Sequence, residues 1–196
     1  MLFSEQNFSL IKPKRGSIEV ICGSMFSGKT EELIRRLRRA EYAQLPLILF
    51  KPQIDTRHES GMVISHDESS FQSVSVKNAR EILDIPKEIK VVGIDEAQFF
   101  DAELKEVCRT LANRGLRVIV AGLDMDFQGE PFGPVPNIMA IAEHVTKVHA
   151  VCVRCGSPAN FSHRKTPSQE KVVIGATELY EPRCRSCYYE STTSSK

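Results

Sequence analysis

Short apolar runs alternate with helix-like stripes along most of the chain. The apolar runs have the length of strands, and continuous runs of this kind are typical of parallel strands buried on both faces. They are Ser17–Cys22, Leu47–Phe50, Val91–Ile94 and Arg117–Ala121, and the pattern of Val145–Val151 is also strand-like. Helices are predicted between the strands, over Thr30–Ala43, Asn78–Leu83, Ala102–Asn113 and Pro136–His144.

The pattern of Thr30–Ala43 is the clearest helical stripe. Its apolar positions are three or four residues apart and therefore share one face, which we expect to be buried. They are Leu33, Ile34, Leu37 and Ala40. The arginines Arg35, Arg36, Arg38 and Arg39 fall between them, and we expect these to lie mostly on the outer face.

Strands that alternate with helices predict an α/β fold, a parallel sheet with helices on both faces. After about residue 151 the amino-acid composition changes, because cysteines, arginines and turn residues dominate. We therefore predict a flexible N-terminal arm over 1–15, an α/β domain over 16–150 and a small second domain over 151–190. The polar stretch 191–196 is predicted to be a disordered tail.

Composition narrows the class of protein. The 196 residues carry a net charge of only +1, which favours neither a nucleic-acid nor a membrane partner. The sequence contains no apolar stretch of the roughly 18 residues that a membrane span needs, and no signal peptide is recognised. We therefore expect a cytoplasmic protein with reduced thiols, in which six cysteines serve metal binding or core packing.

A phosphate-binding loop is predicted between the first strand and the first helix. The segment GSMFSGKT fits G-x-x-x-x-G-K-[ST] and has the strand before it and the amphipathic helix after it that the mechanism needs. Its residues are Gly23, Ser24, Met25, Phe26, Ser27, Gly28, Lys29 and Thr30. Backbone N–H groups would surround the phosphates of ATP, the Lys29 ammonium would reach the β- and γ-phosphates, and the Thr30 hydroxyl would bind Mg²⁺.

Two carboxylates, Asp95 and Glu96, follow the strand Val91–Ile94. In phosphate-loop proteins an aspartate in this position holds Mg²⁺, which is the role expected for Asp95. Glu96 could then act as a general base. If Glu96 deprotonates water, the protein is an ATPase. If Glu96 deprotonates a sugar hydroxyl, the protein is a kinase. The small size of the chain and a candidate lid after residue 151 favour a kinase.

Four cysteines are spaced as two metal-binding knuckles. Cys152 and Cys155 form one C-x-x-C pair, Cys184 and Cys187 form the other, and 28 residues separate the pairs. This pattern predicts a structural Zn²⁺ site that closes the intervening segment into a loop and has no catalytic role. Cys22 and Cys108 are expected in the core.

The motifs together resemble the type II thymidine kinases, from about Gly16 to Tyr189. The matching segments are GSMFSGKT, Asp55-Thr56-Arg57, GIDEAQFF from Gly93, LDMDFQG from Leu123, and Ile174-Gly175 with Tyr180. The resemblance implies a P-loop (RecA-like) sheet flanked by helices, followed by a zinc-binding lasso domain. It also implies transfer of the γ-phosphate of ATP to the 5′-OH of thymidine, giving dTMP and ADP, with deoxyuridine left open as a further acceptor.

The resemblance also assigns residue roles. Glu96 would be the catalytic base, with Lys29 and Arg57 as further catalytic residues. Phe99 and Phe132 are additional candidates for the pocket wall. The residues expected to bind the nucleoside are Met25, Asp55, Gln98, Leu123, Phe127, Ser162, Val172, Val173, Ile174, Gly175 and Tyr180. The family further implies a homotetramer and inhibition by dTTP.

Two other readings remain open. One is a phosphate-loop phosphotransferase or ATPase with a different acceptor. The other is a zinc-ribbon nucleic-acid binder with a vestigial ATPase, although residues 152–196 have only a weak basic excess and no arrangement of aromatic residues for stacking on bases.

Overall fold

The structure is a computed structural model that describes residues 15–54, 62–64, 70–166 and 179–193. Several residues singled out from the sequence lie outside these ranges. They are Asp55, Arg57, Val172, Val173, Ile174 and Gly175. The predicted N-terminal arm, apart from Arg15, also lies outside the described residues.

A six-stranded sheet forms the centre of the protein, and every neighbouring pair of its strands is parallel. The carboxyl ends of all six strands therefore meet at one edge, where α/β proteins place their ligands. In spatial order the strands are β5 (Val74–Val76), β2 (Leu47–Pro52), β6 (Val91–Ile94), β7 (Arg117–Gly122), β1 (Ser17–Cys22) and β8 (His144–Lys147). This order confirms the predicted α/β class.

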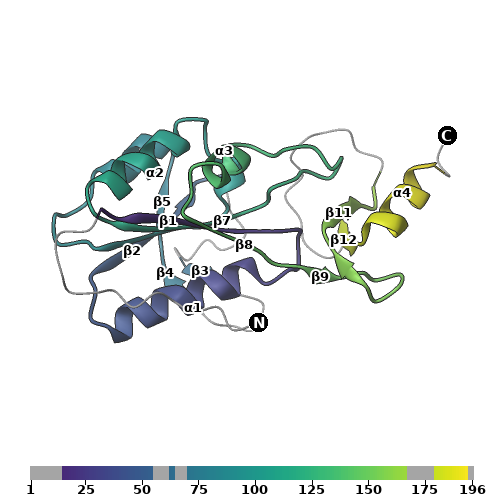
Figure 1. The fold of residues 1–196 in the computed structure, drawn as a ribbon, viewed down its shortest axis with the longest axis horizontal. Coiled ribbons are helices and arrows are strands. Elements are labelled where there is room, and N and C mark those ends of the chain that lie inside the picture. Colours follow the sequence, from purple (N-terminus) through teal and green to yellow (C-terminus); the bar gives the residue numbers. More distant parts are fainter. Residues whose placement is uncertain (1–14, 55–61, 65–69, 167–178, 194–196) are drawn as a thin grey trace.

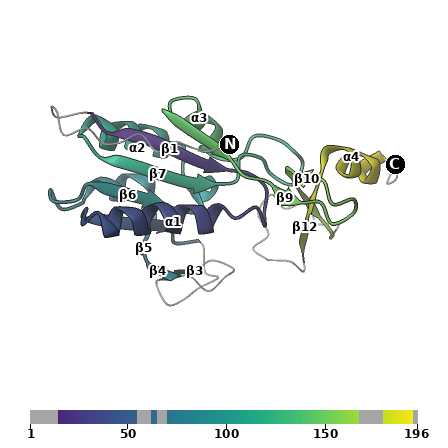
Figure 2. The same cartoon turned by 60° about the horizontal axis from the view of Figure 1, so that its bottom comes forward.

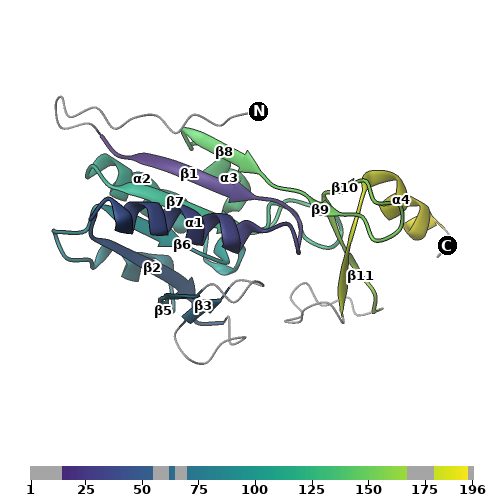
Figure 3. The ribbon, with the colours of Figure 1, turned by 90° about the horizontal axis from the view of Figure 1, so that it is seen from below.

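Helices cover both faces of the sheet (Figure 1). Helix α1 (Lys29–Tyr42) buries the predicted stripe against one face, where it packs on residues such as Ile21 and Ile119. The helices on the opposite face enclose a second, larger core. They are α2 (Leu104–Asn113), α3 (Val135–Met139) and the 3₁₀ segment η1 (Ala79–Leu83). Figure 3 shows α1 lying over the sheet, roughly along the direction of β1 and β7.

The prediction for residues 136–151 is wrong in its boundaries. Helix α3 ends at Met139, and His144 already belongs to β8 rather than to the helix. Pairing with β1 fixes this start, because Glu19 lies opposite His144 in the sheet. The predicted strand-like run Val145–Val151 is also divided. Strand β8 ends at Lys147, and β9 (Ala150–Val151) belongs to a different sheet.

Three of the four α1 arginines are exposed, which confirms the prediction that they lie mostly outside, and Arg36 is the exception. Its side chain is only 11% exposed. The guanidinium contacts Glu32 on its own helix, Glu19 on β1 and the hydroxyl of Thr146 on β8. A single inward arginine thus joins α1 to two strands.

A small unit lies beyond the carboxyl edge of the sheet (Figure 2). It contains β9, β10 (Pro158–Ala159), β11 (Phe161–Arg164), β12 (Tyr180–Arg183) and helix α4 (Arg185–Thr193). Helix α4 was not predicted, and it includes 191–193, where a disordered tail was expected. Helix α4 packs on β11, because the ring of Tyr188 stacks on that of Phe161 with 4.5 Å between the ring centroids.

A short antiparallel hairpin lies before the edge strand β5. It consists of β3 (Met62–Ile64) and β4 (Ser70–Gln72), which the sequence did not reveal. The 3₁₀ segment η2 (Ala97–Phe99) follows β6 directly. Among the helices that the structure describes, each is too short or too polar to span a bilayer.

Candidate active site

The predicted phosphate loop turns from β1 into α1 at the carboxyl edge of the sheet. Two glycines make the turn possible, with φ of 142° at Gly23 and 82° at Gly28. A Cβ at Gly23 would lie 2.1 Å from the carbonyl oxygen of Val148, so a side chain there would collide with the backbone. The Lys29 ammonium lies against the loop and donates a hydrogen bond of 2.7 Å to the carbonyl of Ser24.

Thr30 and Asp95 meet beside this loop, as the sequence predicted for a Mg²⁺ site. The Thr30 hydroxyl donates to Oδ2 of Asp95 at 3.2 Å. Asp95 is buried at the end of β6, and its backbone N–H donates to the carbonyl of Phe50. Both side chains offer oxygen atoms, the ligands that Mg²⁺ prefers. This pair could therefore hold the metal at the mouth of the loop.

Glu96 has a left-handed backbone, with φ of 51°. Such a conformation costs a non-glycine residue about 1 kcal/mol and persists where surrounding contacts enforce it. Its backbone N–H donates to Oδ1 of Asp95 at 2.9 Å, and its Oε2 accepts from Nε2 of Gln98 at 2.5 Å. The left-handed turn thus keeps Glu96 beside Asp95, and Gln98 holds the Glu96 carboxylate.

Gln98 is almost fully buried, and both ends of its amide have partners. Nε2 donates to Glu96, and Oε1 accepts from the backbone N–H of Leu123 at 2.9 Å. The backbone of Gly133 packs closely against that of Gln98, because a Cβ at Gly133 would lie 2.3 Å from the Gln98 carbonyl oxygen. Gln98 therefore links the end of β6 to the segment after β7.

Asp124 is a buried charge at this edge that sequence reasoning missed. Its Oδ2 pairs with the Lys147 ammonium at 2.6 Å, and its Oδ1 has no hydrogen-bond partner among the described residues. Burial, reinforced by the negative charge of Asp124, raises the pKa of the nearby Cys22 thiol to about 11. The available signal was a carboxylate shortly after a buried strand, because Asp124 lies two residues beyond the end of β7 and Asp95 one residue beyond the end of β6.

Two predicted nucleoside residues, Phe127 and Tyr180, meet through Arg164. The Arg164 guanidinium carbon lies 3.6 Å from the centroid of the Phe127 ring, and Nη2 donates to the Tyr180 hydroxyl at 2.7 Å. Arg164 is buried, so this stacked contact is shielded from water. Sequence reasoning did not single out Arg164, because one arginine in a basic segment gives no distinguishing signal.

Other predicted pocket residues also come together. The backbone N–H of Met25 donates to the hydroxyl of Ser162 at 3.0 Å, which joins the loop to the small unit. Phe99 and Phe132 form an edge-to-face pair with ring centroids 5.8 Å apart. The described parts of the predicted nucleoside pocket thus lie along the same edge as the phosphate loop.

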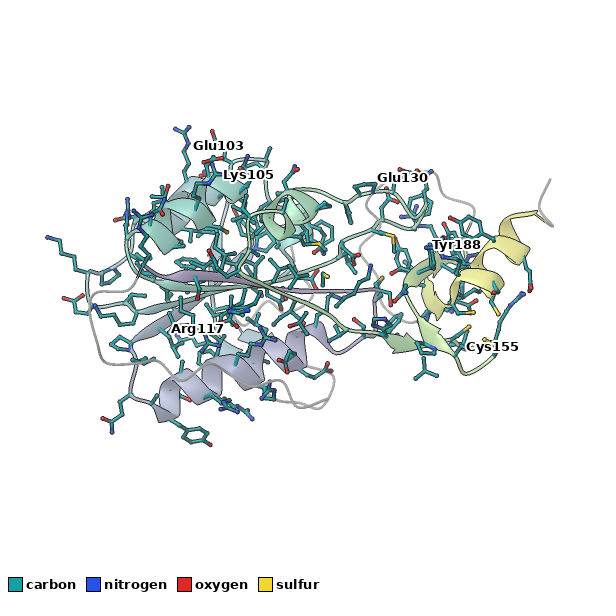
Figure 4. The ribbon with its side chains drawn as sticks, in the orientation of Figure 1. Glu103, Lys105, Arg117, Glu130, Cys155 and Tyr188 are labelled. Carbon is teal, nitrogen blue, oxygen red and sulfur yellow. The ribbon has the colours of Figure 1, made fainter. Side chains whose placement is uncertain are left out.

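The four predicted zinc ligands converge in the small unit. The sulfur atoms of Cys152, Cys155, Cys184 and Cys187 all lie within 4.8 Å of one another. A tetrahedral Zn²⁺ with bonds of about 2.3 Å needs sulfurs roughly 3.8 Å apart. The Sγ atoms of Cys155 and Cys184 are 3.5 Å apart, so the donor set fits this metal. Figure 4 marks Cys155 at the far end of the molecule from α2.

The remaining two cysteines are core residues, as predicted. Both are fully buried, Cys22 in β1 and Cys108 in α2. Burial raises the pKa of the Cys108 thiol to about 12, which keeps it protonated at neutral pH.

Comparison with known proteins gives one consistent answer. A family profile described as thymidine kinase matches residues 16–188. A thymidine kinase of Bacteroides fragilis is 57% identical over 188 residues, which cover 96% of this chain and 94% of that protein. A Rhodothermus thymidine kinase is 57% identical over 88% of this chain and 81% of its own length. A Porphyromonas gingivalis thymidine kinase is 55% identical over 89% of this chain and 86% of its own length. The chain therefore belongs to the thymidine kinase family.

Proposed function

We propose that this protein transfers the γ-phosphate of ATP to the 5′-OH of thymidine and releases dTMP and ADP. The observation that carries the proposal is the contact between Thr30 and Asp95, with Glu96 one residue further along the chain. It brings together, at one edge of the sheet, the phosphate loop, two side chains whose oxygen atoms could hold Mg²⁺, and the Glu96 carboxylate that Gln98 holds. Membership of the thymidine kinase family supports thymidine as the acceptor.

The phosphate loop would bind the triphosphate through its backbone N–H groups and the N-terminus of α1. Lys29 would leave the Ser24 carbonyl and neutralise charge on the β- and γ-phosphates. Thr30 and Asp95 would hold Mg²⁺, which would stabilise negative charge on the phosphate oxygens. The loop thereby orients the γ-phosphorus toward the carboxyl edge of the sheet, where Glu96 lies.

Glu96 would accept the proton of the 5′-OH. The 5′ oxygen then forms a bond to the γ-phosphorus, while the bond from that phosphorus to the β,γ-bridging oxygen breaks and its electron pair leaves with ADP. Gln98 donates a hydrogen bond to the Glu96 carboxylate, and its own Oε1 accepts one from the backbone N–H of Leu123. A base that is already oriented loses little entropy on reaching the transition state.

The thymine ring would lie among Met25, Leu123, Phe127 and Tyr180, with Ser162 nearby. The proposed roles of Asp55 and Arg57 and the base-binding role of 172–175 concern residues outside the described ranges. The backbone groups of that segment could match the N3–H donor and the carbonyl acceptors of thymine. A base with another donor pattern would leave such groups unpaired, which supports selectivity.

Zn²⁺ held by the four cysteines would be structural, because four thiolates leave no open position for a substrate. The homotetramer, inhibition by dTTP and the cytoplasmic location stay predictions from the sequence.

A screen of nucleosides with ATP-to-ADP turnover as the readout tests the proposed function. We expect ADP formation only with thymidine, or with the closely similar deoxyuridine, and a product with the mass of dTMP. ADP formation without any nucleoside would identify an ATPase instead. Salt-sensitive retention on nucleic acid without nucleoside turnover would favour the zinc-ribbon reading.

A further inference from the structure

Phe26, in the middle of the phosphate loop, contacts the small unit. Its φ of 63° is left-handed, which a β-carbon disfavours by about 1 kcal/mol. Its ring packs against the apolar cluster of the small unit, which consists of Ala150, Cys152, Ala159 and Cys187. Two members of that cluster are predicted zinc ligands. The middle of the phosphate loop is therefore attached to the packing around the metal site.

Two hydrogen bonds accompany this contact, one from each of the residues that precede Phe26. The Ser24 hydroxyl donates to the carbonyl of Ala159 at 3.2 Å, and the Met25 N–H donates to the hydroxyl of Ser162 at 3.0 Å. Ala159 and Ser162 lie on β10 and β11, both in the small unit. Three consecutive loop residues thus contact a unit that is more than a hundred residues away in the sequence.

The phosphate loop also has internal hydrogen bonds of its own. Gly23 and Gly28 give it backbone freedom at both ends. The bonds within the loop run from Ser27 and Lys29 to the single carbonyl of Ser24. A left-handed Phe26 persists when packing compensates its cost, and here that packing comes from the small unit.

We propose that Phe26 is a positioning residue that couples the zinc site to the phosphate loop, so that zinc and ATP each strengthen the binding of the other. The inference rests on the proposed binding of ATP by the loop and of zinc by the cysteines. Cys152 and Cys187 would be cross-linked when they hold zinc, which would fix the surface against which Phe26 packs. The fixed loop holds its N–H groups in the orientation that phosphates need, and the linkage is reciprocal by thermodynamic necessity.

The zinc affinity of the holoenzyme, measured by equilibrium competition with a zinc-selective chelator, tests the coupling without any turnover. In the wild type, saturating Mg·ADP should raise the zinc affinity by at least about 5-fold, the lower end of typical coupling between two sites. Phe26→Ala should abolish this gain in zinc affinity and raise the Kd of ADP, measured by calorimetry, by about 10-fold. Phe26→Leu keeps most of the apolar contact and should retain most of the coupling.

Val153→Ala is the matched control, because Val153 lies between Cys152 and Cys155 but is 60% exposed. It should leave both the ADP affinity and the ADP-dependent gain in zinc affinity as in the wild type. A zinc affinity that does not change with ADP in the wild type, or that rises equally in Phe26→Ala, would overturn the coupling alone. A chain that binds no zinc or no ADP would overturn the proposed function as well.

Discussion

The side-chain amide of Gln98 donates a 2.5 Å hydrogen bond to the carboxylate of Glu96. The same amide accepts from the backbone N–H of Leu123, so the side chain proposed as the general base is tied to the neighbouring strand through one buried glutamine. Gln98 was expected to bind the nucleoside. That role stays a prediction, and the two hydrogen bonds of the amide support a further role in orienting Glu96.

Replacement of Gln98 by leucine removes both hydrogen bonds while keeping a similar volume. We expect kcat with thymidine to fall by at least about 10-fold, since a mobile base spends less time in the reactive geometry. The KM for thymidine should change little if Gln98 acts through Glu96. Gln72→Leu, at an exposed position on β4, is the control. A large rise in KM with kcat unchanged would instead assign Gln98 to nucleoside binding.

Lys29→Ala should abolish phosphoryl transfer and leave the fold intact, as judged by circular dichroism and thermal unfolding. Lys29 would supply the positive charge that stabilises the transferring phosphoryl group, and its hydrogen bond to Ser24 is local. Lys105→Ala on the outer side of α2 serves as the control for loss of a lysine (Figure 4). Near-normal turnover by a folded Lys29→Ala protein would remove the assignment of the phosphate loop.

Purified protein should contain about one zinc per chain by elemental analysis. Cys155→Ser should lower this content and the melting temperature, because the metal closes the base of the small unit. Cys108→Ala should leave the zinc content unchanged, since Cys108 is buried in α2 away from the cluster. A metal-free protein whose four cluster thiols all react readily with an alkylating reagent in the native state would contradict the zinc site.

Glu19 should make stability depend on pH. Burial alone would raise the pKa of its carboxyl, but Arg117 and Arg36, at 2.6 and 2.8 Å, outweigh that effect and lower the pKa. A lowered native pKa stabilises the fold above the unfolded value of about 4.3, and this contribution is lost as pH falls through the native pKa.

Glu19→Gln removes the carboxylate that pairs with two largely buried arginines, Arg117 and Arg36, although Arg36 keeps its ion pair with Glu32. It should lower the free energy of unfolding at pH 7 by about 3 kcal/mol. The difference from wild type, measured by urea denaturation, should shrink as pH is lowered below 4.3. The exposed Glu103, paired with Arg80 at the surface, gives the control Glu103→Gln, with a change of at most about 0.5 kcal/mol. An equal loss in both variants would show that burial of the pair contributes nothing.

The central sheet was predictable because its strands are buried on both faces. Continuous apolar runs such as Val91–Ile94 have the same bounds in the structure as in the sequence pattern. The P-loop, the Asp95–Thr30 contact and the cysteine cluster were predictable for another reason, since each depends on residue types at fixed spacing.

The small unit was less predictable, because long-range contacts determine its elements. Helix α4 has a weakly amphipathic pattern, and packing of Tyr188 on Phe161 and the position of Cys187 in the cluster explain its placement. No local pattern reveals that Phe26 packs beside Cys152, or that Arg164 stacks on Phe127. These contacts join segments that only the folded chain brings together.

The most direct test of the proposed mechanism compares Glu96→Gln with Asp95→Asn, two neighbouring changes that each remove one charge and little volume. Glu96→Gln should lower kcat with thymidine by at least about 10²-fold, the scale of a positioned general base, with ATP binding and the Mg²⁺ requirement nearly unchanged. Asp95→Asn should raise the Mg²⁺ concentration needed for half-maximal activity. Wild-type kcat in Glu96→Gln, or a change confined to its Mg²⁺ requirement, would make Glu96 a metal-site residue and contradict its role as the base.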